Sequence, residues 1–183
     1  MSIGKYAFYG CKLLSSMNSD VLGVINIPAS VTSIALSAFE SCSSMAEVSM
    51  GDSVADIGNR AFYGCSNIVK FNSDVAYEMN IPSSCLSIGE YAFYNLKLIK
   101  KLTVNDECAS IGTSALDRMI SLTELTIPYL PTSEYGLAFW FTSYDGSVTG
   151  MENIGKGYRK LPVSLSKVNV TNCTSIPDSA FYG

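Results

Sequence analysis

The segment Ile57–Cys65 reads IGNRAFYGC, and it repeats the segment Ile3–Cys11, IGKYAFYGC, with changes at only two positions. Related segments occur along the whole chain of 183 residues, and they open at Ile3, Ile34, Ile57, Ile88, Ile111, Glu134 and Ile176. The openers lie 31, 23, 31, 23, 23 and 42 residues apart, which gives a basic unit of about 23 residues. Self-similarity at such a period predicts a repeat architecture.

Two adjacent positions of this segment are nearly invariant. The fifth is alanine in every copy, and the sixth is phenylalanine in every copy except one, where Leu116 stands. A small residue beside an aromatic one indicates tight packing between neighbouring units, with the ring in the interior. We therefore interpret the segment as part of the core and not as a ligand site.

A second signature, an apolar, polar, apolar triplet, precedes the openers. The triplets are Ile25–Ile27, Val48–Met50, Met79–Ile81, Leu102–Val104, Leu125–Ile127 and, shifted by one residue, Val168–Val170. Alternation of this kind predicts a short strand with one buried face. One strand in each unit of about 23 residues predicts a parallel β-sheet within a right-handed coil. We expect a single domain over residues 1–183, an α/β repeat solenoid.

The pattern IGxxAFxxCxxLxxLxIPxSVTxI resembles the BspA-like, Treponema-type leucine-rich repeat. The stretches IPASVTSIALSAFESCSSM (27–45), IPSSCLSIGEYAFYNLKLI (81–99) and LPVSLSKVNVTNCTSIPDSAFYG (161–183) carry it, and only an insertion at about residues 142–160 departs from it. The resemblance implies a leucine-rich repeat fold in a bacterial cell-surface or secreted protein. Adhesion to host macromolecules is likewise what the family implies.

Composition argues against several classes of function. The chain has 12 basic and 16 acidic residues, whereas nucleic-acid binding needs a basic surface. We find no transmembrane segment and no signal-peptide pattern. The absence of histidine removes the usual catalytic triads. The sequence also has no CxxC pair, so no zinc-ligand pattern is present. GMENIGKG (150–157) has the spacing of a phosphate-binding loop but lacks its Ser or Thr. We expect no enzyme, no cofactor and no metal.

The six cysteines fall into two columns of the repeat alignment. Cys11, Cys42 and Cys65 share one column with Leu96 and Met119, and Cys85, Cys108 and Cys173 share the other with Val31 and Val54. A position that also accepts Val, Leu or Met is an apolar interior position. We expect buried free thiols, while disulfides between stacked neighbours stay open as an alternative.

The outward residues of the strands form the first candidate ligand face. The central residues of the triplets are Asn26, Ser49, Asn80, Thr103, Thr126 and Asn169. Two positions earlier stand Val24, Glu47, Glu78, Lys101, Glu124 and Lys167. Small hydrogen-bonding groups beside mixed charges suit a flat protein or glycan surface. The alternative is that these residues are simply the solvated face of a sheet.

The insertion is the second candidate, because Trp140, Tyr144 and Tyr158 concentrate aromatic side chains there. Exposed, they would anchor a partner; buried, they would fix the segment. Two units also carry similar eight-residue insertions, NSDVLGVI (18–25) and NSDVAYEM (72–79). We expect these octets to form matching protrusions, such as small hairpins at the Asn-Ser-Asp turn.

The sequence thus predicts a non-enzymatic module that binds a protein or a glycan. The alternative function is that of a spacer that extends another domain from the cell. Because the chain begins and ends within the repeated segment, we also expect it to be a fragment of a longer repeat protein or to associate end to end.

Overall fold

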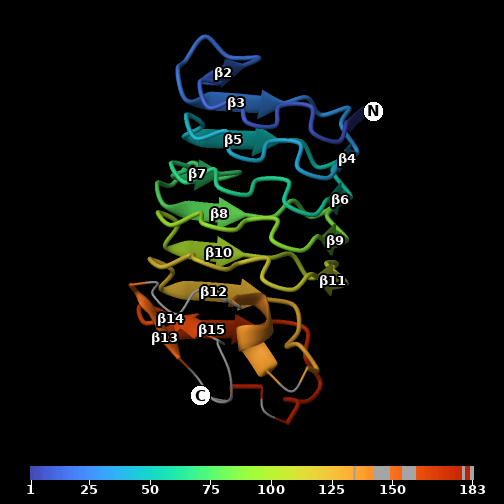
Figure 1. Ribbon diagram of the computed structural model, residues 1–183. Coiled ribbons are helices and arrows are strands. Elements are labelled where there is room, and N and C mark those ends of the chain that lie inside the picture. The colour runs from blue at the N-terminus through green and yellow to red at the C-terminus, as the bar shows by residue number, and fades with distance from the viewer. Residues whose placement is uncertain (134, 142–148, 154–159, 179, 182–183) are drawn as a thin grey trace.

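The computed structural model describes residues 1–133, 135–141, 149–153, 160–178 and 180–181. The chain winds into a stack of coils, and strands from successive coils lie side by side along the stack (Figure 1). The repeat solenoid with a parallel sheet is therefore confirmed. The coils carry two parallel sheets instead of the single one expected.

The long sheet has eight strands in the order β15, β12, β10, β8, β7, β5, β3, β2. Their bounds are β2 Ser16–Met17, β3 Val24–Ile27, β5 Glu47–Met50, β7 Lys70–Phe71, β8 Glu78–Asn80, β10 Lys101–Thr103, β12 Glu124–Ile127 and β15 Lys167–Val170. In three of its four-residue strands, β3, β5 and β12, every second residue is buried, as the period-two alternation predicts. In the fourth, β15, no residue is fully buried.

The short sheet has five strands of two residues each, in the order β1, β4, β6, β9, β11. They are β1 Ser2–Ile3, β4 Ser33–Ile34, β6 Asp56–Ile57, β9 Ser87–Ile88 and β11 Ser110–Ile111. The opening isoleucines pair with one another in register from Ile3 to Ile111. The opener of each repeated segment is thus a strand residue of this second sheet.

The repeated segment itself folds as successive turns that run against the next coil. The N–H of Phe62 donates to the carbonyl oxygen of Ala92 at 2.9 Å, and the N–H of Phe39 donates to that of Ala61 at 2.8 Å. Alanine permits this close approach of two backbones, while the phenylalanine rings stack inside. Ring centroids lie 5.4 Å apart for Phe39 and Phe62, and 5.9 Å apart for Phe62 and Phe93.

Positive φ angles explain why these return segments are turns and not α-helices. The fourth residue of each segment has φ between 52° and 57°, at Tyr6, Ser37, Arg60, Tyr91 and Ser114. The eighth residue also has positive φ in each of these five segments. A left-handed residue interrupts a right-handed helix. Helix is limited, among the described residues, to the 3-10 helix η1, Gly136–Phe141.

The octets do not form hairpins, so that expectation is wrong. In each octet the first six residues form a loop between two parallel strands, and the last two begin the second strand. Lys70 pairs with Glu78 across β7 and β8, and Ser16 pairs with Val24 across β2 and β3. Long parallel strands need connections of about a dozen residues or more. A strand of two residues is only about 7 Å long, so a short loop returns the chain to its start.

The extra strand β7, which directly precedes the second octet, also contributes a core residue. The Phe71 ring packs edge to face against Phe62 and Phe93, with centroid distances of 5.1 and 5.6 Å. The added strand therefore widens the long sheet and fills the interior beneath it with its own fully buried ring. The short sheet receives no matching strand, because β6 pairs directly with β9.

The regular coils give way to irregular structure after β12. η1 follows, and β13 Met151–Asn153 pairs antiparallel with β14 Lys160–Pro162. The opener expected at Glu134 lies outside the described residues. The parallel sheet then resumes with β15, which pairs with β12.

Candidate binding surfaces

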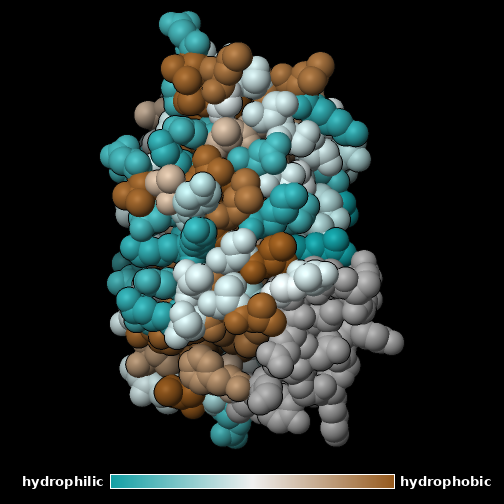
Figure 2. All heavy atoms as spheres, turned by 90° about the vertical axis from the view of Figure 1, so that its left-hand side faces the viewer, coloured by the Kyte–Doolittle hydropathy of each residue, from teal (hydrophilic) through white to brown (hydrophobic). Residues whose placement is uncertain are grey.

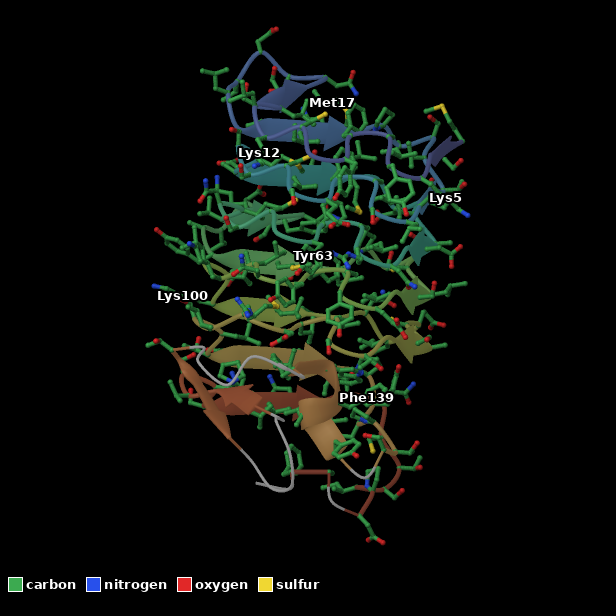
Figure 3. The ribbon with its side chains drawn as sticks, viewed as in Figure 1. Lys5, Lys12, Met17, Tyr63, Lys100 and Phe139 are labelled. Atoms are coloured by element: carbon green, nitrogen blue, oxygen red, sulfur yellow. The ribbon has the colours of Figure 1, made fainter. Side chains whose placement is uncertain are left out.

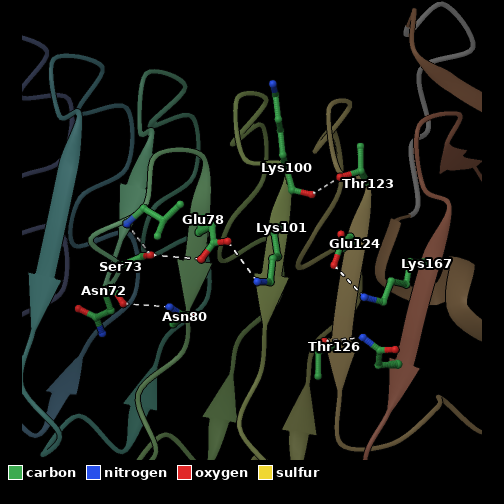
Figure 4. Close-up of polar contacts among 12 residues, drawn as sticks. Asn72, Ser73, Glu78, Asn80, Lys100, Lys101, Thr123, Glu124, Thr126 and Lys167 are labelled. Atoms are coloured by element: carbon green, nitrogen blue, oxygen red, sulfur yellow. Dashed lines mark hydrogen bonds and ion pairs between the residues drawn. The ribbon is translucent and has the colours of Figure 1, made fainter.

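The outer face of the long sheet carries a column of alternating charges. In register across six strands stand Glu47, Lys70, Glu78, Lys101, Glu124 and Lys167. Three ion pairs cross between strands: Glu47 with Lys70 at 3.0 Å, Glu78 with Lys101 at 3.1 Å, and Glu124 with Lys167 at 3.3 Å. The last two are visible in Figure 4. We call these six residues the charged column.

Each glutamate of the charged column pairs with a lysine, so the six residues together carry no net charge. Each pair is solvent-accessible and therefore contributes little stability by itself, about 0 to 1 kcal/mol. Its larger effect is on register, because like charges directly opposite each other destabilise a sheet. Sequence reasoning missed Lys70, since a two-residue strand is too short to show alternation. Without β7, Glu47 and Glu78 would face each other.

A neutral column runs beside the charged column, two residues further along each strand. The structure places all six predicted central residues on this face: Asn26, Ser49, Asn80, Thr103, Thr126 and Asn169. Ser49 Oγ donates to Asn26 Oδ1 at 2.7 Å, and Asn169 Nδ2 donates to Thr126 Oγ1 at 3.2 Å. Figure 4 shows the second of these contacts.

Asn72 is a further polar residue beside this column that the sequence did not reveal. It directly follows β7, and its Oδ1 accepts a hydrogen bond from the N–H of Met50 at 2.7 Å. Its backbone carbonyl accepts from Asn80 Nδ2 at 3.2 Å (Figure 4). Asn72 therefore links β5 to β8 across the short strand. The use of the neutral column as a ligand face stays a prediction.

A stack of tyrosine and arginine side chains lies on the repeated segments, away from the long sheet. The rings of Tyr63 and Tyr94 are parallel within 2°, with centroids 4.2 Å apart. Arg60 lies over Tyr63 at 4.2 Å, and Arg118 lies over Tyr94 at 5.2 Å. Tyr63 is labelled in Figure 3. Because the ring faces are covered by one another and by guanidinium groups, the stack joins coils and offers no flat aromatic platform.

Arg60 also forms a two-point contact with a buried carboxylate. Its Nε and Nη2 donate to the two carboxylate oxygens of Glu40 at 3.1 and 2.9 Å, and Glu40 is only 5% exposed. Such a fork-to-fork pair satisfies the buried charge. No sequence signal marked these positions, because they fall at the variable letters of the repeated segment.

Trp140 does not form an exposed anchor. It is 1% exposed, and its Nε1 donates to the carbonyl oxygen of Ile111 at 3.1 Å. The hydroxyl of Tyr129 accepts the N–H of the same Ile111 at 2.9 Å, and the two rings meet edge to face. These side chains thus satisfy the edge of β11. Of the two alternatives for Trp140, the buried one applies. Tyr144 and Tyr158 lie outside the described residues.

The six cysteines are free thiols, of which four are buried. The thiols of Cys42 and Cys65 donate to the carbonyl oxygens of Phe8 and Phe39, each at 3.0 Å. Burial raises the pKa of Cys42 to about 11. Such thiols are poor nucleophiles. The expectation of burial is wrong for Cys11 and Cys173, which are exposed; the coil of Cys11 has a described neighbour on one side only.

In the part of the chain that the structure describes, no three side chains from Cys, Asp or Glu gather as a metal site. The same residues include no helix long and apolar enough to cross a bilayer.

The coils, the parallel sheets and the interior phenylalanine ladder define a leucine-rich repeat solenoid. A family model described as the BspA type leucine rich repeat region, in 6 copies, matches residues 1–77 and 71–183. The chain belongs to this family. Leucine-rich repeat domains are generally interaction or structural modules. No curated protein matches the chain.

Solved structures of bacterial leucine-rich repeat proteins share the fold. The leucine rich repeat protein of T. pallidum aligns with TM-score 0.56 and 23% identity over 68% of this chain and 50% of its own. A leucine rich cell surface protein from Faecalibacterium prausnitzii gives 0.57 and 19% over 83% of this chain and 33% of its own. A Bacteroides ovatus protein gives 0.55 and 25% over 68% and 34%. This chain thus spans half or less of each of these proteins.

Proposed function

We propose that this chain is a non-enzymatic binding module of a bacterial surface or secreted protein, and that the neutral column contacts a protein or glycan ligand. The observation that supports this proposal is that the charged column and the neutral column lie side by side on one face of the long sheet. The charged column satisfies its own charges, whereas the neutral column presents amide and hydroxyl groups that pair only in part with one another. From Asn80 to Asn169 these groups stand on neighbouring strands about 4.8 Å apart, and β7 separates this run from Asn26 and Ser49. A regular array of neutral donors and acceptors suits an extended ligand.

Support for the location comes from the family and from one relative. The F. prausnitzii protein is described as a cell surface protein. We extend that location to this chain, together with adhesion to host or neighbouring-cell macromolecules, as part of the same proposal. It includes the view that residues 1–183 form one domain.

A ligand screen tests the proposal directly. Immobilised matrix proteins and glycans are screened for binding, and any ligand is then titrated with the double variant Thr103→Ala, Thr126→Ala. We expect at least a tenfold loss of affinity, because two central groups of the neutral column disappear. Ser110→Ala, on the short sheet, is the matched control and leaves affinity unchanged. Equal binding by the double variant and the control would refute the proposal.

Ionic strength provides a second readout. Salt screens interactions between exposed charges, with a Debye length of about 10 Å at 0.1 M. Because the neutral column carries no charge, we expect affinity to change less than about twofold between 50 and 500 mM NaCl. A steep fall with salt would assign the contact to the charged column instead.

The alternative function, a spacer, draws on the same self-paired face, since a surface that satisfies its own groups needs no partner. In that case the screen gives no ligand for the wild-type chain, and the chain serves to set the distance between other domains.

End-to-end association is proposed as well. The N-terminal end of the stack exposes apolar side chains, with Leu13 at 89% and Leu22 at 80%, and Figure 2 shows the apolar surface there at the top. A second copy that stacks its β15 edge against β2 would cover this surface and extend the long sheet. Light scattering at rising concentration tests this, with Leu13→Lys and Leu22→Lys as the variant expected to remain monomeric.

A further inference from the structure

The outer face of the long sheet is not uniformly flat. A hollow of about 250 Å3 lies over β3, β5 and β7. It is lined by Val24, Asn26, Glu47, Val48, Ser49, Lys70, Asn72, Ser73 and Asp74. Four of these belong to the charged and neutral columns, and three come from the start of the second octet loop. The hollow thus lies between the candidate ligand face and the second octet (72–79), which interrupts the repeat.

The short strand β7 accounts for the position of the hollow. β5 continues to Met50, whereas β7 ends at Phe71 and the chain turns at Asn72, where φ is 47°. Ser73 Oγ accepts the N–H of Val75 at 3.1 Å and holds the loop in this turn (Figure 4). The loop therefore borders a space that a longer strand would fill. The first octet repeats this turn, with Asn18 at φ 51° and Ser19 Oγ accepting the N–H of Val21 at 3.1 Å.

Hydrogen-bonding capacity remains inside the hollow. Asn72 uses its Oδ1 for Met50, while its Nδ2 has no hydrogen-bond partner among the described residues. Ser49 Oγ donates to Asn26 Oδ1 and keeps lone pairs that can accept. Asp74 is exposed and forms no ion pair within the described part of the chain. One amide donor, one hydroxyl and one carboxylate acceptor are therefore free for a ligand.

Charge and size restrict that ligand. Lys70 is paired with Glu47 at 3.0 Å, so Asp74 supplies the only uncompensated charge among the residues that line the hollow. This negative charge repels anionic ligands. The hollow is smaller than the ~300 Å3 at which pockets for drug-sized ligands begin, so it accepts a small ligand or one unit of a large one. No aromatic side chain lines it, so stacking does not contribute.

We infer that this hollow binds one sugar ring of a neutral glycan, with adjacent hydroxyls directed at Asn72 and Asp74. Each sugar hydroxyl both donates and accepts a hydrogen bond, and a neighbouring pair matches an amide donor beside a carboxylate acceptor. A peptide offers fewer such pairs of groups, and the Asp74 carboxylate repels a phosphate. This inference rests on the proposed function, in that it names the ligand class and the place on the same face.

Titration of the 15N-labelled protein by NMR tests the inference. The probes are the methyl β-glycosides of glucose, galactose and N-acetylglucosamine, with inorganic phosphate and glycinamide as the anion and peptide arms. We expect at least one glycoside to give saturable shifts at the backbone amides of residues 47–50 and 70–75, with a Kd of about 1 mM, as befits a single ring. Phosphate and glycinamide should give none.

Three variants sharpen the test. Ser49→Leu fills the hollow from an exposed strand position and should abolish the shifts, and Asp74→Ala should weaken binding at least fivefold. Ser110→Leu makes the same kind of change at an exposed position of β11 on the short sheet, outside the hollow and outside both columns, and should bind as the wild type does. Should Ser49→Leu fail to fold, Asp74→Ala alone decides, because its side chain makes no ion pair that folding could need.

Three outcomes would overturn the inference. No saturable shift with any glycoside, or shifts centred away from residues 47–50 and 70–75, would show that the hollow is not a sugar site. Phosphate binding there would reject the neutral ligand. The proposed function has a separate test. It is supported if the Thr103→Ala, Thr126→Ala variant loses affinity for the screened ligand, whatever the result with the glycosides.

Discussion

The two parallel sheets of this solenoid differ in how much change they accept. The short sheet adds a strand of two residues for each coil and keeps its isoleucines in one unbroken register. The long sheet follows the same coils but also accepts two extra strands, β2 and β7, which directly precede the octets. Variation is thus concentrated on one side of the coil.

Backbone packing explains the difference. Along the short sheet, a Cβ on Gly89 would lie 2.4 Å from the backbone nitrogen of Asn59, and one on Gly112 would lie 2.5 Å from that of Glu90. Neighbouring coils touch there through their main chains. Along the long sheet, every second side chain lies on the outer face, and the added strand β7 brings its own core residue, Phe71. The tolerant side is therefore the one on which a binding surface can vary.

The largest expected effect comes from forcing a side chain into the short sheet. Gly89→Ala should lower the free energy of unfolding by about 3 kcal/mol, because main chain must move to admit the methyl group. Gly4→Ala is the control, since nothing lies within 4 Å of its added Cβ. Urea denaturation measures both. Equal stability of the two variants would mean that the coils do not pack this closely.

The buried thiols before the short sheet predict a pH effect of slightly smaller size. Burial raises the pKa of Cys85 from 9.0 to about 12 and that of Cys108 to about 11. The folded state holds these protons more tightly than the unfolded state. Their contribution is complete below pH 9 and is lost as the pH rises toward 11, by about 1.4 kcal/mol per pH unit and thiol.

Denaturation at pH 7, 9 and 10 checks this effect. The double variant Cys85→Val, Cys108→Val uses the residue found in the same column at Val31 and Val54. At pH 10 it should lose about 2 to 3 kcal/mol less than the wild type loses. The same loss of stability with rising pH in both proteins would contradict the assignment of this effect to Cys85 and Cys108.

On the long sheet, reversal of one charge should have a moderate effect. Lys70→Glu places a third carboxylate between Glu47 and Glu78, and should lower stability by about 1 kcal/mol at low salt. The loss should shrink in 1 M NaCl, where the Debye length is about 3 Å. Lys70→Gln separates the missing attraction from the added repulsion. A salt-independent loss would point to packing instead of charge.

The smallest effect is expected where the two octets differ. Gly23 and Tyr77 occupy the same place at the end of each loop, with φ of 86° and 69°. Tyr77→Gly removes the cost of a left-handed tyrosine but also its contact with Lys100, whose Nζ lies 4.8 Å from the ring centroid. We expect a net gain of about 0.5 kcal/mol in thermal denaturation. A loss above 1 kcal/mol would show that the ring contact dominates.

The sequence predicted the coil stack, the strand positions and the interior alanine and phenylalanine columns, because these depend on residues that recur at a fixed spacing. It also placed the six central residues, Asn26 to Asn169, on one face. Apolar periodicity carries such information locally, within each unit.

The features that the sequence did not reveal depend on contacts between units. β7 has only two residues, so no alternation could mark it, and Lys70 and Asn72 were missed with it. The pairing of Tyr63 with Tyr94 joins variable letters 31 residues apart. The role of Trp140 required knowledge that it reaches Ile111, 29 residues earlier.

Trp140 is an intrinsic fluorescence probe of one part of this protein. It is the only tryptophan of the chain, and it is buried where η1 meets the last strand of the short sheet. Coils of a solenoid contact only their neighbours, so the end of the stack can open before the centre does. Indole fluorescence therefore monitors this junction alone, while circular dichroism follows the whole stack. The separation between the two melting curves would measure how strongly the terminal coil is coupled to the rest.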